Sequence, residues 1–138
     1  MHASGTRSTA HRRTRGFTLI ELMVTCAIVA ILMAIAVPSY ALFMKQSRRG
    51  GAEAVLMDIA QREQQYLLDV RAYAATPAAL NTTVPVDVSA YYTITIVPAV
   101  GPPPTFTVTA TPIAGTAQAG DPTLSIDNTG AKLPTSVW

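Results

Sequence analysis

The sequence has little of what enzymatic chemistry requires. Among 138 residues there is one cysteine, and the two histidines, His2 and His11, lie near the amino terminus. Residues 17–138 therefore contain no imidazole, and their single thiol allows no internal disulfide and no His-based metal site. A glycine-rich phosphate-binding loop is also absent. We therefore expect no enzyme, no bound cofactor and no metal.

Positive charge is scarce outside the amino terminus. Only 13% of the residues are charged, and four of the ten basic residues are arginines within the first 15 positions. The rest of the chain holds six basic against eight acidic residues, a formal side-chain charge of −2. Between residues 71 and 138 the basic residues are only Arg71 and Lys132. Nucleic-acid binding needs a basic patch, so charge does not support DNA as a partner.

Long apolar runs are limited to one, the 21 residues from Phe17 to Val37, in which the only charge is Glu21. As an α-helix this segment would reach roughly 31 Å, enough to cross the hydrocarbon core of a membrane. An acid buried at that depth costs on the order of 2.5 to 3.5 kcal/mol, so such a residue needs a partner or a function.

The position of Glu21 indicates what that partner is. If the chain were cut between Gly16 and Phe17, the new α-amino group would lie about one helical turn from the carboxylate. Glu21 could pair with the amine of its own chain or with that of a neighbour in a bundle of identical helices. At an effective dielectric constant near 20, two charges about 4 Å apart attract by roughly 4 kcal/mol, comparable to the burial cost.

Two simpler interpretations of this amino terminus remain open. Basic residues, an apolar stretch and the run Ala34-Ile35-Ala36 also fit an ordinary secretory signal, and an uncut signal anchor is the other alternative. However, the apolar run exceeds the usual 7 to 15 residues of a signal core, and an ordinary signal peptide has no use for Glu21.

After Pro38 the apolar pattern becomes one-sided, which predicts an amphipathic helix over residues 38–71. Asp58 and Arg62 have ion-pair spacing. Bends or local melting are expected at Pro38 and at Gly50-Gly51. The apolar positions that recur at three- and four-residue steps, and that we expect in the core, are Ala52, Val55, Leu56, Ile59, Tyr66, Leu67 and Val70.

The last third of the chain predicts a connection followed by a sheet. Residues 72–89 contain two prolines and are expected to form a long loop. In residues 90–138, apolar residues alternate with threonine, which is typical of half-buried strands. A turn at Asp127-Asn128-Thr129-Gly130 would lead into a short final hairpin. The expected fold class is α+β, a long amino-terminal helix packed on an antiparallel sheet of three to four strands.

The segment GFTLIELMVTCAIVAILMAIAVPSY resembles the prepilin signature of type IV pilins and pseudopilins. That resemblance implies a basic leader over residues 1–16, a prepilin peptidase that cuts after Gly16, N-methylation of Phe17, and a need for Glu21 in filament assembly. The later segments QREQQYLLDVRAYA, YYTITI, FTVTATPIAG and LSIDNTGAKL, with the terminal tryptophan, resemble the PilE-like minor pilins.

One feature departs from that group. Its members usually carry a carboxy-terminal disulfide, with one cysteine just before the final tryptophan, but here Val137 precedes Trp138. The only cysteine, Cys26, lies in the apolar helix and is interpreted as a small hydrophobic residue. How the last 20 or so residues are held is left open. Asp121 and Asp127 resemble acids of the calcium loop of major pseudopilins, but we interpret them as turn residues.

The resemblance implies a structural subunit, a minor pilin of the type IV pilus. Its precursor would cross the inner membrane once, and the mature protein would be part of a pilus at the cell surface, serving twitching motility, adhesion or DNA uptake. The implied partners are other pilins through the amino-terminal helix, the prepilin peptidase and the inner-membrane assembly machinery. The alternatives are a DNA-uptake receptor pilin and a pseudopilin of type II secretion.

Overall fold

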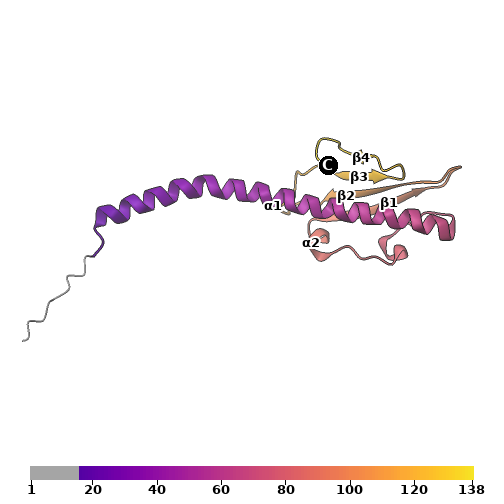
Figure 1. Cartoon of the computed structure of the whole chain (residues 1–138), viewed down its shortest axis with the longest axis horizontal. Helices are drawn as coiled ribbons and strands as arrows, with labels where there is room; N and C mark the ends of the chain where they lie inside the picture. The colour runs from indigo at the N-terminus through magenta and orange to yellow at the C-terminus, as the bar shows by residue number, and fades with distance from the viewer. Residues whose placement is uncertain (1–15) are drawn as a thin grey trace, which may run out of the picture. The chain divides into compact units, whose positions relative to one another are not determined.

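The structure is a computed structural model that describes residues 16–138, so the rest of the leader lies outside it. The described residues up to Ser39 belong to one compact unit, and Tyr40–Trp138, here called the head, form a second. The order of elements along the chain is one long helix, two short helical turns and four strands (Figure 1).

Helix α1 runs over Leu19–Val70, 52 residues. It remains helical through Pro38 and Gly50-Gly51, so the local melting expected there is wrong for this structure. Proline removes only one backbone hydrogen bond, and the turns on either side continue the helix. Arg71 ends it, because its φ of 60° lies in the left-handed region.

The connection after α1 is more ordered than the predicted loop. It contains a 3₁₀-helix, η1, at Pro77–Leu80 and a single α-helical turn, α2, at Val86–Ser89. Thr76 caps η1 by accepting a hydrogen bond from the Ala79 amide, and Pro77 begins the turn, where no donor is needed. Leu80 and Val88 are buried, which anchors both turns to the core.

The sheet has four antiparallel strands in the order β1-β2-β3-β4. Their bounds are Tyr92–Ala99, Thr105–Pro112, Leu124–Asp127 and Lys132–Leu133. The register pairs Tyr92 with Pro112 and Val108 with Ile126. The final hairpin predicted from the Asp-Asn-Thr-Gly turn is present as β3 and β4.

The core lies between one side of α1 and the inner face of the sheet. Tyr73 and Phe106 meet edge to face with ring centroids 4.7 Å apart. The predicted α+β fold is therefore confirmed, but Val70 is wrong as a core residue, since 52% of it is exposed at the end of the helix. The buried apolar residues are Ala52, Leu56, Ile59, Ala74, Leu80, Val88, Tyr92, Ile96, Phe106, Val108, Ala110, Leu124 and Ile126.

Candidate functional site

The first turn of α1 holds the acid that the sequence singled out. Thr18 caps the helix, because its Oγ1 accepts a hydrogen bond from the Glu21 amide at 3.3 Å and its carbonyl accepts one from the Leu22 amide at 3.2 Å. Glu21 thus lies where the positive end of the helix dipole favours an acidic side chain. The local sequence alone places this carboxylate at the start of the helix.

Gly16, Phe17 and Glu21 lie together in the structure. With Thr18 they line an open depression of about 420 Å³. Phe17 is 83% exposed, and Glu21 is exposed and forms no ion pair with any residue of the described chain. A Cβ atom at Gly16 would meet nothing within 4 Å, so packing in this chain gives no reason for glycine at that position.

The residues after Glu21 form an uncovered apolar surface. α1 is the one helix of the described chain that is long and apolar enough to cross a membrane, with a window of mean hydropathy 2.6 that is not buried at all. Cys26 is an exposed free thiol on this surface. In water such a surface would be strongly unfavourable, so it suits lipid or the helices of other subunits.

The head contains a buried polar cluster, made of Arg49, Tyr92, Gln118 and Asp121, that the sequence did not predict. Arg49 Nε donates to Asp121 Oδ2 at 3.0 Å, and Arg49 Nη2 forms an ion pair with Oδ1. The Tyr92 hydroxyl donates to Asp121 Oδ2 at 2.5 Å, and Gln118 Nε2 donates to the same oxygen at 3.0 Å. Asp121 is 7% exposed, so interpreting it as an ordinary turn residue is wrong.

The charges of the polar cluster are set by its geometry. Burial alone would raise the pKa of the Asp121 carboxyl, but the hydrogen bonds from Arg49, Tyr92 and Gln118 outweigh burial and lower this pKa to about 2. Burial and the adjacent carboxylate raise the pKa of the Tyr92 hydroxyl. At neutral pH the cluster is therefore a carboxylate, a guanidinium and a neutral phenol.

The same region ties the segment after β2 to α1. Lys45 Nζ donates to the Ala119 carbonyl at 3.1 Å, and Gln118 Nε2 also donates to the Lys45 carbonyl at 3.1 Å. Together with the pair formed by Arg49 and Asp121, these bonds join residues more than 70 positions apart. They fix the chain before β3, where the missing disulfide had left the geometry open.

The carboxyl terminus is held by its own contacts. Asp127 Oδ1 accepts hydrogen bonds from the amides of Thr129 at 2.8 Å and Ala131 at 3.0 Å, which confirms Asp127 as a turn residue. Trp138 Nε1 donates to the Leu133 carbonyl at 3.0 Å, and Lys132 Nζ lies 4.6 Å from the centre of the Trp138 ring. These contacts fold the last residues back onto the final hairpin.

Asp121 and Asp127 do not form a common cation site. Asp121 is bound to Arg49, whereas Asp127 binds the amides of its own turn. Among residues 16–138 no group of three or more His, Cys, Asp or Glu side chains is arranged to hold a metal ion.

Glu63 is a second buried acid, on the side of α1 that faces the core. It is 0% exposed, and its Oε2 accepts a hydrogen bond from the Ala74 amide at 2.9 Å. Its other oxygen has no partner in the described chain. Burial raises the pKa of this carboxyl, and the bond from Ala74 only partly offsets the increase. Glu63 therefore links the helix to the segment that follows it at an electrostatic cost.

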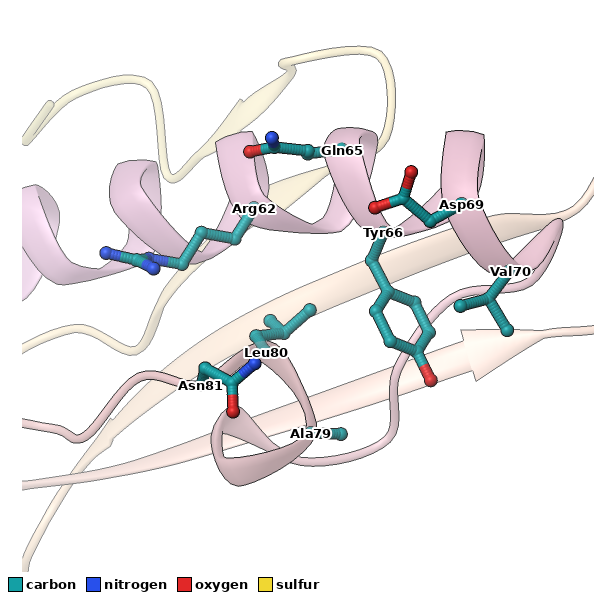
Figure 2. A pocket seen from close by; sticks show the side chains of 8 residues that line it. All are labelled: Arg62, Gln65, Tyr66, Asp69, Val70, Ala79, Leu80 and Asn81. Atoms are coloured by element: carbon teal, nitrogen blue, oxygen red, sulfur yellow. The ribbon is translucent and has the colours of Figure 1, made fainter.

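An open groove of about 370 Å³ lies between α1 and η1. Figure 2 shows the Tyr66 ring extending from α1 toward η1, while Arg62 extends away from Tyr66. Arg62 Nε binds Asp58 Oδ2 at 2.8 Å, which confirms the ion-pair spacing seen in the sequence. The polar groups at this groove do not converge on one point, so it offers no arrangement typical of a reaction centre. The groove is lined by Arg62, Gln65, Tyr66, Asp69, Val70, Ala79, Leu80 and Asn81.

Most basic side chains of the head are held by other groups of the head. Arg49 and Arg62 are in ion pairs, Arg48 lies 4.2 Å from the centre of the Tyr91 ring, and Lys132 lies over Trp138. Cations held in this way are less available to a polyanion than free ones.

An exposed apolar helix with one acid in its first turn, and a small antiparallel sheet packed on a helix, define the pilin class of filament subunits. Residues 38–123, more than half of the chain, match the family model described as "Type IV minor pilin ComP, DNA uptake sequence receptor". Residues 11–37 match the "Prokaryotic N-terminal methylation motif". The chain belongs to the type IV minor pilin family.

Similar proteins are pilins as well. The chain is 36% identical over half its length to the "Type IV wide pilus major component PilA4" of Thermus thermophilus, covering 53% of that protein. It is 37% identical over 45% of its length to the "Type IV major pilin protein PilA" of Myxococcus xanthus, covering 28% of that protein. A solved type IV pilin from Shewanella oneidensis aligns with a TM-score of 0.54 and 26% identity, over 68% of this chain and 97% of that one.

Proposed function

We propose that this chain is a subunit of a type IV pilus, made as a membrane-inserted precursor and processed before assembly. The observation that carries this proposal is the exposed carboxylate of Glu21 in the first turn of an uncovered apolar helix, directly after Gly16 and Phe17. The match of residues 11–37 to the methylation motif supports it. The similar proteins are pilins, which favours a pilus over a secretion pseudopilus.

In this proposal a prepilin peptidase cuts after Gly16 and the new amino group of Phe17 is methylated. The amine is then the positive partner that Glu21 lacks within the described chain. When the helix leaves the membrane and packs among other subunits, Glu21 pairs with the amine of a neighbour. Pairing removes the burial cost of the acid and fixes the register of the helices.

The test is the substitution Glu21→Ala, with Glu53→Ala in the head as the matched control. The Glu21 variant should insert and be cut normally but be missing from sheared surface filaments, because its register contact is lost. The control should enter filaments at the wild-type level. Normal incorporation of Glu21→Ala would show that the pairing is not needed.

A second candidate function is that of a DNA receptor during uptake. The observation that favours it is the family model over residues 38–123, whose description names a DNA uptake sequence receptor. The ion pairs that hold Arg49 and Arg62 within the head argue against tight, charge-driven binding. A gel-shift titration of the full chain in detergent at low salt decides this question, since the absence of any shift would remove the receptor function.

A further inference from the structure

The outer face of the sheet has an unusual composition. Along β1 and β2, buried residues alternate with outward ones, and threonine fills most of the outward positions. The register pairs Thr93 with Thr111 and Thr95 with Thr109, so these threonine side chains form rows across the two strands. The threonine face, as we call it, consists of Thr93, Thr95, Thr105, Thr107, Thr109 and Thr111.

The threonine face is almost free of charge. On β3 these rows continue with Ser125 opposite Thr109 and Asp127 opposite Thr107. Asp127 is the one charged residue in the rows on β1, β2 and β3, and its carboxylate accepts hydrogen bonds from amides of its own turn. No lysine or arginine lies in β1, β2 or β3.

This lack of charge is not explained by the fold alone. Threonine favours strands, so a single outward threonine needs no explanation. Solvated sheet surfaces, however, usually carry charged side chains that prevent association. A surface without cations is also unsuited to DNA or anionic lipid, which are polyanionic. The composition therefore fits a neutral partner.

We propose that the threonine face binds the threonine face of a second copy of this chain, displayed on a neighbouring filament. A hydroxyl both donates and accepts hydrogen bonds, so two identical faces related by a two-fold axis are complementary. No like charges oppose each other across such a contact. This proposal rests on the proposed function, because it requires that the subunit be part of a filament.

The size of the threonine face predicts how strong the contact is. Strands β1 and β2 have eight residues each and β3 has four. With strands spaced by about 4.8 Å and about 3.4 Å per residue, the face covers roughly 330 Å² on each copy. Two copies would bury roughly 650 Å², below the about 1,200 Å² typical of stable complexes. One contact is therefore weak, and filaments join only where each presents several copies. Bundling should increase with the number of copies per filament.

The test compares sheared filaments of the wild type with filaments carrying Thr95→Lys and Thr107→Lys. Wild-type filaments should form bundles that pellet at low speed and are visible by negative-stain electron microscopy. The lysine filaments should pellet at least tenfold less at low salt, because the two faces repel. Gln65→Lys, on α1 outside the threonine face, is the matched control and should bundle normally.

Filaments that carry opposite charges on the threonine face should bundle with each other. Filaments with Thr95→Glu and Thr107→Glu should also stay separate, but an equal mixture with the lysine filaments should bundle again. The proposal would be overturned if the lysine filaments bundled by themselves. It would also be overturned if wild-type filaments stayed single or bundled only with an added polysaccharide. The amount of pilin in the sheared fraction is measured in parallel, and its loss in the wild type would contradict the proposed function instead.

A second variant keeps the proposal falsifiable if the lysine chains do not assemble. Filaments with Thr95→Cys should become joined by disulfides between filaments under mild oxidation, whereas filaments with Gln65→Cys should not. Equal cross-linking of the two variants would overturn the proposal.

Discussion

At the scale of single residues, the two ion pairs of the head differ in burial, and this difference predicts their contributions to stability. The Asp121 side chain is 2% exposed, whereas that of Asp58 is 49% exposed. We predict that Asp121→Asn lowers the free energy of unfolding by about 3 kcal/mol, because it leaves a partly buried Arg49 without its charge partner and removes the charged acceptor of the buried Tyr92 and Gln118. Asp58→Asn should cost at most about 1 kcal/mol. Denaturant unfolding of the full chain in detergent, followed by Trp138 fluorescence, measures both.

The same residue predicts the acid response of the head. Because the pKa of Asp121 is lowered to about 2 from its ordinary value near 3.8, its carboxylate stabilises the fold fully above the ordinary value. That contribution is lost as the pH falls from about 4 through about 2. The wild type should lose stability in this window, and Asp121→Asn should lose less. Parallel losses in both proteins would contradict the account of the polar cluster.

Glu63 predicts a pH dependence of opposite sign. Burial raises its pKa in the folded protein, so the folded state holds the proton more tightly than the unfolded one. Stability should therefore fall as the pH rises through the range between the ordinary and the raised pKa. Glu63→Gln should remove this pH dependence of stability and should unfold at a higher denaturant concentration than the wild type at pH 7. The exposed control Asp69→Asn should keep the pH dependence. A pH dependence that persists in Glu63→Gln would contradict this prediction.

Residue roles that depend on local sequence were predictable, and those that depend on distant partners were not. The spacing of Asp58 and Arg62 gave their ion pair, because both lie on adjacent turns of one helix. Arg49 and Asp121 are 72 positions apart, and no local pattern marks them as partners. Glu63 resembles every other polar residue of the helix in sequence, so only the structure shows that it is buried.

At the scale of elements, periodicity identified α1 and the strands because each extends over several repeats of its pattern. The turns η1 and α2 have four residues each, too few for a helical period to be seen. They were therefore predicted as loop, although Thr76 caps η1 and burial of Leu80 and Val88 anchors both turns to the core.

The two adjacent glycines of α1 give a prediction at this scale. A Cβ atom at Gly51 would lie 3.5 Å from Val88 Cγ2 in α2, whereas one at Gly50 would meet nothing within 4 Å. We expect Gly50→Leu to raise the free energy of unfolding by about 0.5 to 1 kcal/mol, because leucine favours the helix. Gly51→Leu should lower it by about 1 to 3 kcal/mol through overpacking against α2. Thermal unfolding of the full chain in detergent compares them, and equal effects would show that α2 does not pack on Gly51.

At the scale of the whole molecule, the family, the α+β fold and the membrane-length helix followed from the sequence, because an uninterrupted apolar run with one acid is a strong and local signal. The way in which the head is held without a disulfide did not follow, since it depends on the long-range polar cluster. Processing, methylation and incorporation into a filament remain proposals, because they depend on partners outside the chain.

The most direct test of these proposals is the mass of the amino-terminal peptide of this subunit, released by protease from sheared surface filaments. We expect a peptide that begins at Phe17 and carries one extra methyl group on its amino nitrogen. A chain with Gly16→Leu should instead remain in the membrane as an uncut precursor. A filament subunit whose first residue is anything other than Phe17 would contradict the account, because Glu21 would then lack the amine that the assembly contact requires.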